Sequence, residues 1–341
     1  MPPTSLSAPP LTVLGAGAWG TTLAWLLANN GHQVRLWARN ADAADAIQRA
    51  RRNEKYLPGL ALPERVTATA DLAAALAAAS HVFAVVPARA LSEVMREARR
   101  SGAEPAAVVS CVKGLAISVT GPKQRLRRAS ELIAAELPGV RVAALSGPNL
   151  ASEIAAGLPA ATTIASADAP LGAELQGLLQ QATFRVYTSS DIVGVELAGA
   201  LKNIIAMAAG ICDGLALGDN AKSTIITRGL AELVRLGTHL GGQERTFYGL
   251  AGVGDIVATC VSDRSRNHTA GVLLAGGEKL DGPRLSALTA EGVPTVAAVF
   301  AYARATGVEL PITTEVYKVA YQAKPPRQAM LDLMAREGKA E

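Results

Sequence analysis

Residues 11–20, Leu-Thr-Val-Leu-Gly-Ala-Gly-Ala-Trp-Gly, decide the fold of the amino-terminal part of the chain. The apolar run Leu11–Leu14 predicts a strand, and Gly15, Gly17 and Gly20 follow it in the spacing G-x-G-x-x-G. The first glycine permits a tight turn, the second lets backbone amides approach a pyrophosphate, and the third allows close helix–strand packing. A helix that begins here points free N–H groups at the phosphates. The stretch therefore predicts a dinucleotide-binding turn, and the plain alternative is a tight turn that binds nothing.

Short apolar runs alternate with helical segments as far as residue 190. We expect strands at 11–14, 33–37, 82–86, 107–112, 142–145, 161–164 and 184–187, and helices at 20–29, 41–52 and 71–79, the last with Asp71 as its N-cap. This alternation predicts a parallel, doubly wound, Rossmann-like sheet with helices on both faces. From residue 192 onward the patterns are helical (192–211 and 221–240, then a break at 249–254), which predicts an all-α second domain. The predicted organisation is a tail at 1–10, a dinucleotide-binding domain at 11–190 and a helical substrate and catalytic domain at 191–341.

The composition is that of a folded chain. Of the 341 residues, 50% are hydrophobic and 18% are charged, so a disordered chain is excluded, and the length suggests two domains. The net charge is +4, and the densest basic clusters, Arg99-Arg100 and residues 125–128, contain no aromatic side chain. We interpret both clusters as solvated helix faces and expect no nucleic-acid partner.

The three cysteines, at 111, 212 and 260, and the four histidines are dispersed without metal-ligand spacing. We predict no metal site, and buried thiols in a reducing cytoplasm. Residues 1–10 hold four prolines but neither a positive start nor an apolar run, which is typical of a frayed tail and not of a signal peptide. Without an uninterrupted apolar stretch of about 18 residues, no membrane span is expected.

The segment Trp37-Ala38-Arg39-Asn40 closes the second predicted strand, where an acidic residue would accept hydrogen bonds from a ribose 2′-hydroxyl. No carboxylate is present before Asp42. Arg39 can instead stack on adenine and contact a 2′-phosphate, although a solvated arginine at a strand end is the alternative. We predict that NADPH is accepted and preferred, and that NADH can also serve.

Four further segments carry polar residues in a characteristic order. They are Cys111-Val112-Lys113-Gly114, Ser146-Gly147-Pro148-Asn149-Leu150-Ala151, Ala200-Leu201-Lys202-Asn203, and Gly252-Val253-Gly254-Asp255 with Ser265-Arg266-Asn267. Together with the glycine turn, they resemble the bacterial NAD(P)-dependent glycerol-3-phosphate dehydrogenase family over nearly the whole chain. The resemblance implies a two-domain arrangement like that of 6-phosphogluconate dehydrogenase. It also implies reversible reduction of dihydroxyacetone phosphate to sn-glycerol 3-phosphate, an oxidoreductase reaction that supplies phospholipid biosynthesis in lipid metabolism.

Lys202 lies in an otherwise apolar helix. A lysine in that setting, taken alone, snorkels outward to the helix edge as often as not. Gly199, however, lies one turn earlier on the same side, so the ammonium would pass over a spot with no side chain, leaving room for a ligand. A partly desolvated lysine has a lowered pKa and can move protons near neutrality. The resemblance makes Lys202 the general acid/base and places Asp255 on the substrate beside it, although Asp255 could also be a plain N-cap.

Ser265-Arg266-Asn267 offers a hydroxyl, a guanidinium fork and an amide in consecutive positions, which suits a phosphate dianion. A polar surface loop is the plain alternative. The resemblance assigns to the substrate Lys113, Gly147, Asn149, Lys202, Asp255, Ser265, Arg266 and Asn267. It assigns to the cofactor Gly15, Gly17, Ala18, Trp19, Gly20, Arg39, Lys113, Ala151, Arg266, Thr289 and Glu291. The family usually has serine or threonine where Asn149 stands and threonine where Val112 stands, and this lowers the weight of Asn149.

Two other functions stay open at this point. One is a dehydrogenase of the same two-domain plan that acts on a β-hydroxyacid or a sugar acid, and only the leading hypothesis requires a phosphate group on the substrate. The other is a dinucleotide-sensing regulatory protein without catalysis, against which Lys202 and Asp255 argue because a sensor needs no base. The alanine-rich helices of the second domain could form the face of a homodimer.

Overall fold

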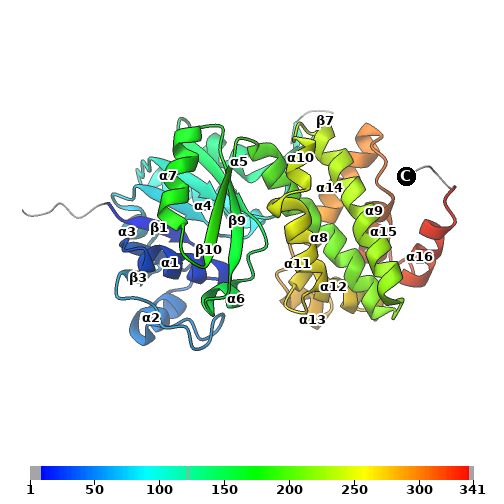
Figure 1. The fold of residues 1–341 in the computed structure, drawn as a ribbon, viewed down its shortest axis with the longest axis horizontal. Helices are drawn as coiled ribbons and strands as arrows, with labels where there is room; N and C mark the ends of the chain where they lie inside the picture. The colour runs from blue at the N-terminus through cyan, green and yellow to red at the C-terminus, as the bar shows by residue number, and fades with distance from the viewer. Residues whose placement is uncertain (1–8, 121–122, 338–341) are drawn as a thin grey trace, which may run out of the picture. The chain divides into compact units, whose positions relative to one another are not determined.

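The chain folds into two compact units, and one segment that lies within the sequence of the first unit belongs to the second. The structure is a computed structural model and describes residues 9–120 and 123–337, so most of the tail expected at 1–10 lies outside the described residues. The first unit contains the described residues up to 112 together with 129–192, and the second contains 113–128 together with those from 193 onward (Figure 1). The sequence places a single boundary near residue 190, whereas in the structure the segment 113–128 packs with the second unit.

An eight-stranded sheet forms the centre of the first unit. Its strands are β1 (Leu11–Leu14), β2 (Val34–Trp37), β3 (Val66–Thr69), β4 (His81–Ala84), β5 (Ala107–Ser110), β8 (Arg141–Ser146), β9 (Ala160–Ala165) and β10 (Phe184–Ser189). The spatial order is β10-β9-β8-β5-β4-β1-β2-β3. Neighbouring strands are parallel except β8 and β9, which pair antiparallel.

The predicted parallel, doubly wound sheet is confirmed, and it contains one antiparallel pair, β8 with β9. The connection 147–159 leaves β8 and returns from the same edge of the sheet without crossing it, so β9 must run in the opposite direction. The order reverses direction beside β1, where β4 lies on one side and β2 on the other. This is the topological switch point at which doubly wound sheets bind ligands, and the glycine turn follows β1 there.

Helices cover both faces of this sheet, as Figure 1 shows. On one face a core forms from residues of α1 (Ala18–Asn29), α2 (Ala41–Ala50), α6 (Ala151–Ala155) and α7 (Ala169–Leu179). On the other face a second core forms from α3 (Leu72–Leu76), α4 (Ala88–Arg100) and α5 (Ala129–Glu136). Asp71 accepts a hydrogen bond from the Ala74 N–H at 3.0 Å, which confirms it as the N-cap of α3.

The second unit consists of helices and one two-stranded antiparallel hairpin. Its elements are β6 (Ala116–Thr120), β7 (Lys123–Arg127), α8 (Ile192–Gly214), α9 (Gly218–His239), α10 (Glu244–Phe247), the π-helical turn η1 (Leu250–Gly254), α11 (Asp255–Val261), α12 (Arg266–Ala275), α13 (Pro283–Ala287), α14 (Gly292–Thr306), α15 (Pro311–Tyr321) and α16 (Pro326–Met334). The hairpin packs against α14. The break expected at 249–254 is thus a π-helical turn that leads directly into α11.

The basic cluster at 125–128 is not a helix face. Arg125 and Arg127 lie in β7, and the guanidinium of Arg128 lies 2.8 Å from the carboxylate of Glu196 near the start of α8. That carboxylate is buried, so the arginine compensates a charge inside the second unit. Arg99 and Arg100, by contrast, are exposed in the last turn of α4, as the sequence predicts.

Helix α8 is the core of the second unit. Every residue from Gly194 to Cys212 is buried, and polar side chains such as Lys202 and Asn203 interrupt the apolar run. By length and composition α8 could cross a membrane, yet 89% of its most apolar window is buried inside the structure. Its apolar surface is therefore already used in packing.

Candidate functional site

The three glycines of the turn differ in what surrounds them. Gly15 has φ +117°, and a Cβ there would lie 2.6 Å from the carbonyl oxygen of Val85. A Cβ on Gly20 would lie 1.8 Å from the carbonyl oxygen of Gly15, whereas a Cβ on Gly17 would meet nothing within 4 Å. Gly15 and Gly20 are thus required for packing, and the open space at Gly17 fits the approach of a pyrophosphate.

Helix α1 begins at Ala18 with Gly17 as its N-cap, two residues earlier than the sequence suggests. Its first N–H groups have no partner within the helix, which suits a negatively charged phosphate. The buried side chain of Asn53, which the sequence did not single out, donates hydrogen bonds to the Ala16 carbonyl at 2.9 Å and to the hydroxyl of Thr21 at 2.8 Å. Asn53 therefore holds the turn and the first turn of α1 together.

Two cofactor candidates flank the turn. The ring of Trp19 packs against that of Phe184, with centroids 6.4 Å apart, so it belongs to the core beside α1. Arg39 is exposed two residues after the end of β2, and the next residue, Asn40, caps α2 by accepting from the Ala43 N–H. The position after β2 thus presents a guanidinium and a neutral cap where a carboxylate would otherwise meet a ribose.

The loop after β8 carries the candidates Gly147, Asn149 and Ala151. Gly147 has φ +156°, and a Cβ there would lie 3.1 Å from the Cα of Thr162. The Asn149 amide donates to the hydroxyl of Thr162 at 2.9 Å, and the Ala151 carbonyl accepts from the hydroxyl of Thr22 at 3.2 Å. These bonds tie the loop to β9 and to α1 and so fix the backbone of all three candidates.

The central feature of the second unit is a buried lysine–aspartate pair. The Nζ atom of Lys202 lies 2.7 Å from Oδ1 of Asp255 and also donates to the hydroxyl of Thr259. That hydroxyl donates in turn to Oδ1 of Asp255 at 3.1 Å. Lys202 and Asp255 are exposed to 5% and 2%, so the ammonium does not snorkel outward. Asp255 is the first residue of α11, whose N-cap is Gly254, and its carboxylate is hydrogen-bonded to the lysine.

A second ammonium group shares the carboxylate of Asp255. Nζ of Lys113 lies 2.6 Å from Oδ2, so each oxygen of Asp255 faces one lysine. The backbone carbonyl of Lys113 accepts a hydrogen bond from the Asn203 amide at 2.8 Å, next to Lys202 on α8. Lys113, Lys202 and Asp255, which come from three distant parts of the sequence, therefore form one cluster.

The surroundings shift the ionisation of this cluster in a direction that suits proton transfer. The pKa of Lys202 is lowered to about 8: burial lowers it most, the charge of Asp255 opposes this, and the charge of Lys113 adds to the lowering. Burial acts to raise the pKa of Asp255, but the two neighbouring ammonium groups outweigh it and hold that pKa below its usual value. The aspartate is therefore ionised near neutrality while Lys202 can exchange its proton.

The candidate phosphate-binding residues lie at the start of α12. The hydroxyl of Ser265 caps that helix by accepting from the His268 N–H at 3.2 Å. The amide of Asn267 donates to Oδ1 of Asn203 at 2.8 Å, and its own oxygen accepts from the Gly292 N–H at 2.9 Å. Asn267 is thus connected to α8, next to Lys202, and to the start of α14.

The other candidates of the second unit are less enclosed. Arg266 and Thr289 are exposed, and Glu291 is half-buried at the N-cap position of α14. Of the candidates in this unit, the structure joins Lys113, Lys202 and Asp255 directly and Asn267 through Asn203.

Two polar residues of the cluster were missed from the sequence. Thr259 lies four residues after Asp255, one helical turn further along the same face, and this spacing is the only signal that could have found it. Asn203 stood in the segment that carries the family resemblance, but an amide on a helix suggests no role by itself. Its contacts with Lys113 and Asn267 become visible only in three dimensions.

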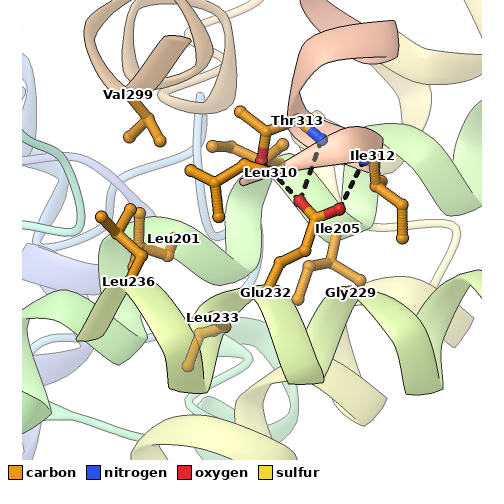
Figure 2. Close-up of a pocket in the computed structure, with 11 residues that line it drawn as sticks. Leu201, Ile205, Gly229, Glu232, Leu233, Leu236, Val299, Leu310, Ile312 and Thr313 are labelled. Atoms are coloured by element: carbon orange, nitrogen blue, oxygen red, sulfur yellow. Dashed lines mark hydrogen bonds between the residues drawn. The ribbon is translucent and has the colours of Figure 1, made fainter. Parts of the chain in front are cut away.

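A second buried carboxylate in this unit belongs to the architecture. Figure 2 shows Glu232 of α9 beside a small pocket lined mainly by apolar side chains. Its oxygens accept hydrogen bonds from the N–H groups of Ile312 and Thr313 and from the Thr313 hydroxyl, at the start of α15. Burial raises its pKa to about 6. All of its oxygens' partners are backbone or hydroxyl donors of α15, so it caps that helix from a neighbouring one.

Within residues 9–120 and 123–337, no group of three or more histidine, cysteine or carboxylate side chains is placed to hold a metal ion. All three cysteines are buried thiols. Burial raises the pKa of Cys212 to about 11 and that of Cys260 to about 12, so neither thiol is a nucleophile near neutrality.

Comparisons with known proteins agree over both units. Residues 10–171 match the family model for the N-terminus of NAD-dependent glycerol-3-phosphate dehydrogenase, and residues 191–331 match the model for its C-terminus. The chain is 46% identical over 335 residues to glycerol-3-phosphate dehydrogenase (NAD(P)+) of Geobacillus thermodenitrificans, covering 97% of this chain and 96% of the relative. It is similar to the crystal structure of glycerol-3-phosphate dehydrogenase from Coxiella burnetii, with a TM-score of 0.90, 39% identity and coverage of 96% and 99%. The structure of the enzyme from Saccharomyces cerevisiae gives a TM-score of 0.80 at 28% identity, with coverage of 96% and 99%.

Proposed function

Because the chain belongs to the NAD-dependent glycerol-3-phosphate dehydrogenase family, we propose that it catalyses the reversible reduction of dihydroxyacetone phosphate to sn-glycerol 3-phosphate with NAD(P)H. The observation that carries the proposal is the buried Lys202, hydrogen-bonded to Asp255 and Thr259. A dehydrogenase of this kind needs a group that exchanges a proton at the C2 oxygen, and a lysine with a pKa near 8 can do so at neutral pH.

Lys202 is the proton donor in the reduction. A nicotinamide bound at the glycine turn would supply the hydride to C2, or accept it in the reverse direction. As the C2 carbonyl oxygen gains negative charge, the Lys202 ammonium donates a proton to it and becomes a neutral amine. In the oxidation the amine takes that proton back from the C2 hydroxyl. Asp255 and Thr259 hold the Nζ atom in one position through both directions.

The phosphate of the substrate is the proposed ligand of Ser265, Arg266 and Asn267. Arg266 offers a two-pronged donor, and the hydroxyl and amide offer further hydrogen bonds. The Lys113 ammonium adds positive charge on the Asp255 side of the cluster. Gly147 and Asn149 are proposed as further substrate contacts through the loop after β8. The phosphate requirement separates this function from that of a dehydrogenase acting on a β-hydroxyacid or a sugar acid.

The dinucleotide is the proposed ligand of the turn in the first unit. The open space at Gly17 and the N-terminus of α1 support pyrophosphate binding, and Ala18, Trp19 and Ala151 are proposed as further cofactor contacts. We propose that Arg39 contacts a 2′-phosphate, so that NADPH is preferred and NADH is also accepted. Further cofactor contacts are proposed for Lys113, Arg266, Thr289 and Glu291.

In the cell, this reaction would supply the glycerol backbone of phospholipids. The buried thiols support a reducing compartment, and we propose the cytoplasm.

The direct test is the absorbance of the reduced cofactor. Purified protein mixed with dihydroxyacetone phosphate and NADPH should oxidise the cofactor, and a panel with β-hydroxyacids and sugar acids should not react. Lys202→Ala should lose turnover by about a thousandfold or more while it still binds NADPH. A wild-type chain that leaves the cofactor unchanged would overturn the function, and an active Lys202→Ala variant would move the acid/base role to another residue.

A further inference from the structure

The first turn of α12 presents two of the proposed phosphate ligands, and the next residue points inward. After the cap Ser265, the helix begins with Arg266 and Asn267, and His268 follows them. Arg266 is exposed, whereas His268 is exposed to only 6%. The side chain of His268 is therefore directed away from the face on which a phosphate would bind.

His268 is attached to the end of α8. Its Nε2 atom lies 2.7 Å from Oδ2 of Asp213, in the last turn of that helix. Nζ of Lys222, in α9, lies 2.6 Å from the same oxygen. Burial acts to raise the pKa of Asp213, but the hydrogen bonds from Lys222 and His268 outweigh it and lower that pKa. Because an ionised carboxylate only accepts, the imidazole must donate through Nε2–H.

The backbones of α8 and α12 also touch. A Cβ on Gly210 would lie 2.0 Å from the carbonyl oxygen of His268, and a Cβ on Gly271 would lie 2.1 Å from that of Met207. The glycines thus set the separation of the two helices at backbone contact. Beyond this contact, two side-chain bonds join α12 to α8 and limit its rotation about the crossing: the bond from Asn267 to Asn203 and the bond from His268 to Asp213.

We propose that the His268–Asp213 bond is a positioning device for the phosphate-binding turn, and that it fixes Arg266 and Asn267 relative to Lys202 on the same helix α8. Lys222 keeps the carboxylate charged and in place. His268 touches neither substrate nor cofactor in this role and acts through the orientation of its helix. The inference rests on the proposed function, since it assumes that the turn binds the substrate phosphate.

Three variants at one position test the proposal. His268→Ala removes the bond, His268→Gln places an amide N–H where Nε2 lies, and His268→Asn places it one atom short. We expect the alanine and asparagine variants to raise KM for dihydroxyacetone phosphate about tenfold, and the glutamine variant to restore it. The kcat value and the KM for NADPH should stay within about twofold of wild type, since Lys202 and the glycine turn are unchanged.

Unphosphorylated dihydroxyacetone at high concentration provides the matched control, because it does not use the phosphate ligands. Its kcat/KM should be the same in the wild type and in all three variants. Equal KM values for dihydroxyacetone phosphate in the asparagine and glutamine variants would overturn the inference, even if the alanine variant fails to fold. An inactive wild-type chain would instead overturn the proposed function, and the inference with it, so the two failures are distinguishable.

Discussion

Lys202 and Asp255 are 53 residues apart in the sequence, yet Nζ of the first lies 2.7 Å from Oδ1 of the second in a buried setting. The other oxygen of the same carboxylate faces Lys113. The negative charge of Asp255 therefore lies between the ammonium groups of Lys113 and Lys202, and burial penalises the charge of Lys202 most because that side chain is the more buried. This balance makes Lys202 the group that gives up a proton most readily.

The pH dependence of turnover should report this balance. The oxidation of glycerol 3-phosphate requires the neutral amine of Lys202, so its kcat/KM should rise with pH through about 8. The reduction requires the ammonium, so its kcat/KM should fall above the same pH. The measurement is kcat/KM in both directions from about pH 6 to about pH 10. Profiles that bend the same way in both directions would contradict the assignment.

Replacement of Lys113 should move that inflection. Lys113→Gln removes a positive charge that lowers the pKa of Lys202 and leaves Asp255, which raises it. The bend in the pH profile is expected at higher pH, even though substrate affinity also falls. Lys279→Gln, at an exposed lysine elsewhere in the unit, is the control and should not move it. An inflection at the wild-type pH or below in Lys113→Gln would show that the two lysines are not coupled.

Two glycines of the turn should respond differently to the same change. Gly20→Ala would place a methyl group 1.8 Å from the Gly15 carbonyl and should lower the free energy of unfolding by about 1–3 kcal/mol or more. Gly17→Ala meets no protein atom within 4 Å, so we expect less than about 1 kcal/mol of lost stability. It should nevertheless weaken NADPH binding at least about tenfold. Thermal unfolding and a binding titration measure the two effects, and undiminished binding by Gly17→Ala would remove the turn from the cofactor site.

Arg39 should distinguish the two cofactors. Arg39→Ala removes the proposed partner of the 2′-phosphate, and we expect kcat/KM for NADPH to fall about tenfold while that for NADH changes little. Steady-state kinetics with both cofactors make the comparison. Equal losses with the two cofactors would indicate stacking on adenine alone. No loss with either would support the alternative, in which Arg39 is a solvated arginine at the end of a strand.

Glu232 should lower the free energy of unfolding as the pH rises, which is opposite to the effect of a carboxylate whose pKa is lowered on folding. Its pKa rises from 4.5 to about 6 on folding, so the folded chain binds the proton more tightly than the unfolded chain does. This contribution is fully present below about pH 4.5 and is lost as the pH rises through about 6. Relative to Glu232→Gln, the wild type should therefore lose about 2 kcal/mol of unfolding free energy from well below pH 4.5 to well above pH 6. Chemical denaturation measures it, with the exposed Glu64→Gln as control; a constant difference would refute the shift.

Much of the first unit is visible in the sequence because its strands are apolar runs. The strand predicted at 11–14 has the same bounds in the structure, and the context of the glycine turn follows from it. The strand β3 at Val66–Thr69 was missed because it lies at the edge of the sheet and only alternate residues are buried. A four-residue edge strand carries no apolar run that a sequence pattern can reveal.

The site was predictable as candidates but not as a cluster. Lys202 and Asp255 stand out because a charge on an apolar helix and a carboxylate after glycines are unusual. Lys113 contacts the same carboxylate of Asp255 across 142 residues of sequence, and no local pattern contains such a contact. Thr259 had no signal except its helical spacing from Asp255, and a threonine on a helix is ordinary.

The segment 113–128 links the two units in the coding sequence as well as in the fold. The chain passes from one unit to the other after residues 112, 128 and 192, so no single cut separates them. A fragment that starts at residue 193 would lack both Lys113 and Arg128. Asp255 would lose one of its ammonium partners, and the buried Glu196 would lose its guanidinium, at a cost of about 3–5 kcal/mol for a broken buried pair. Gene fusion therefore could not transfer the helical unit to another nucleotide-binding domain as one continuous coding segment. Two of the positive charges that compensate its buried carboxylates are encoded within the sequence of the first unit.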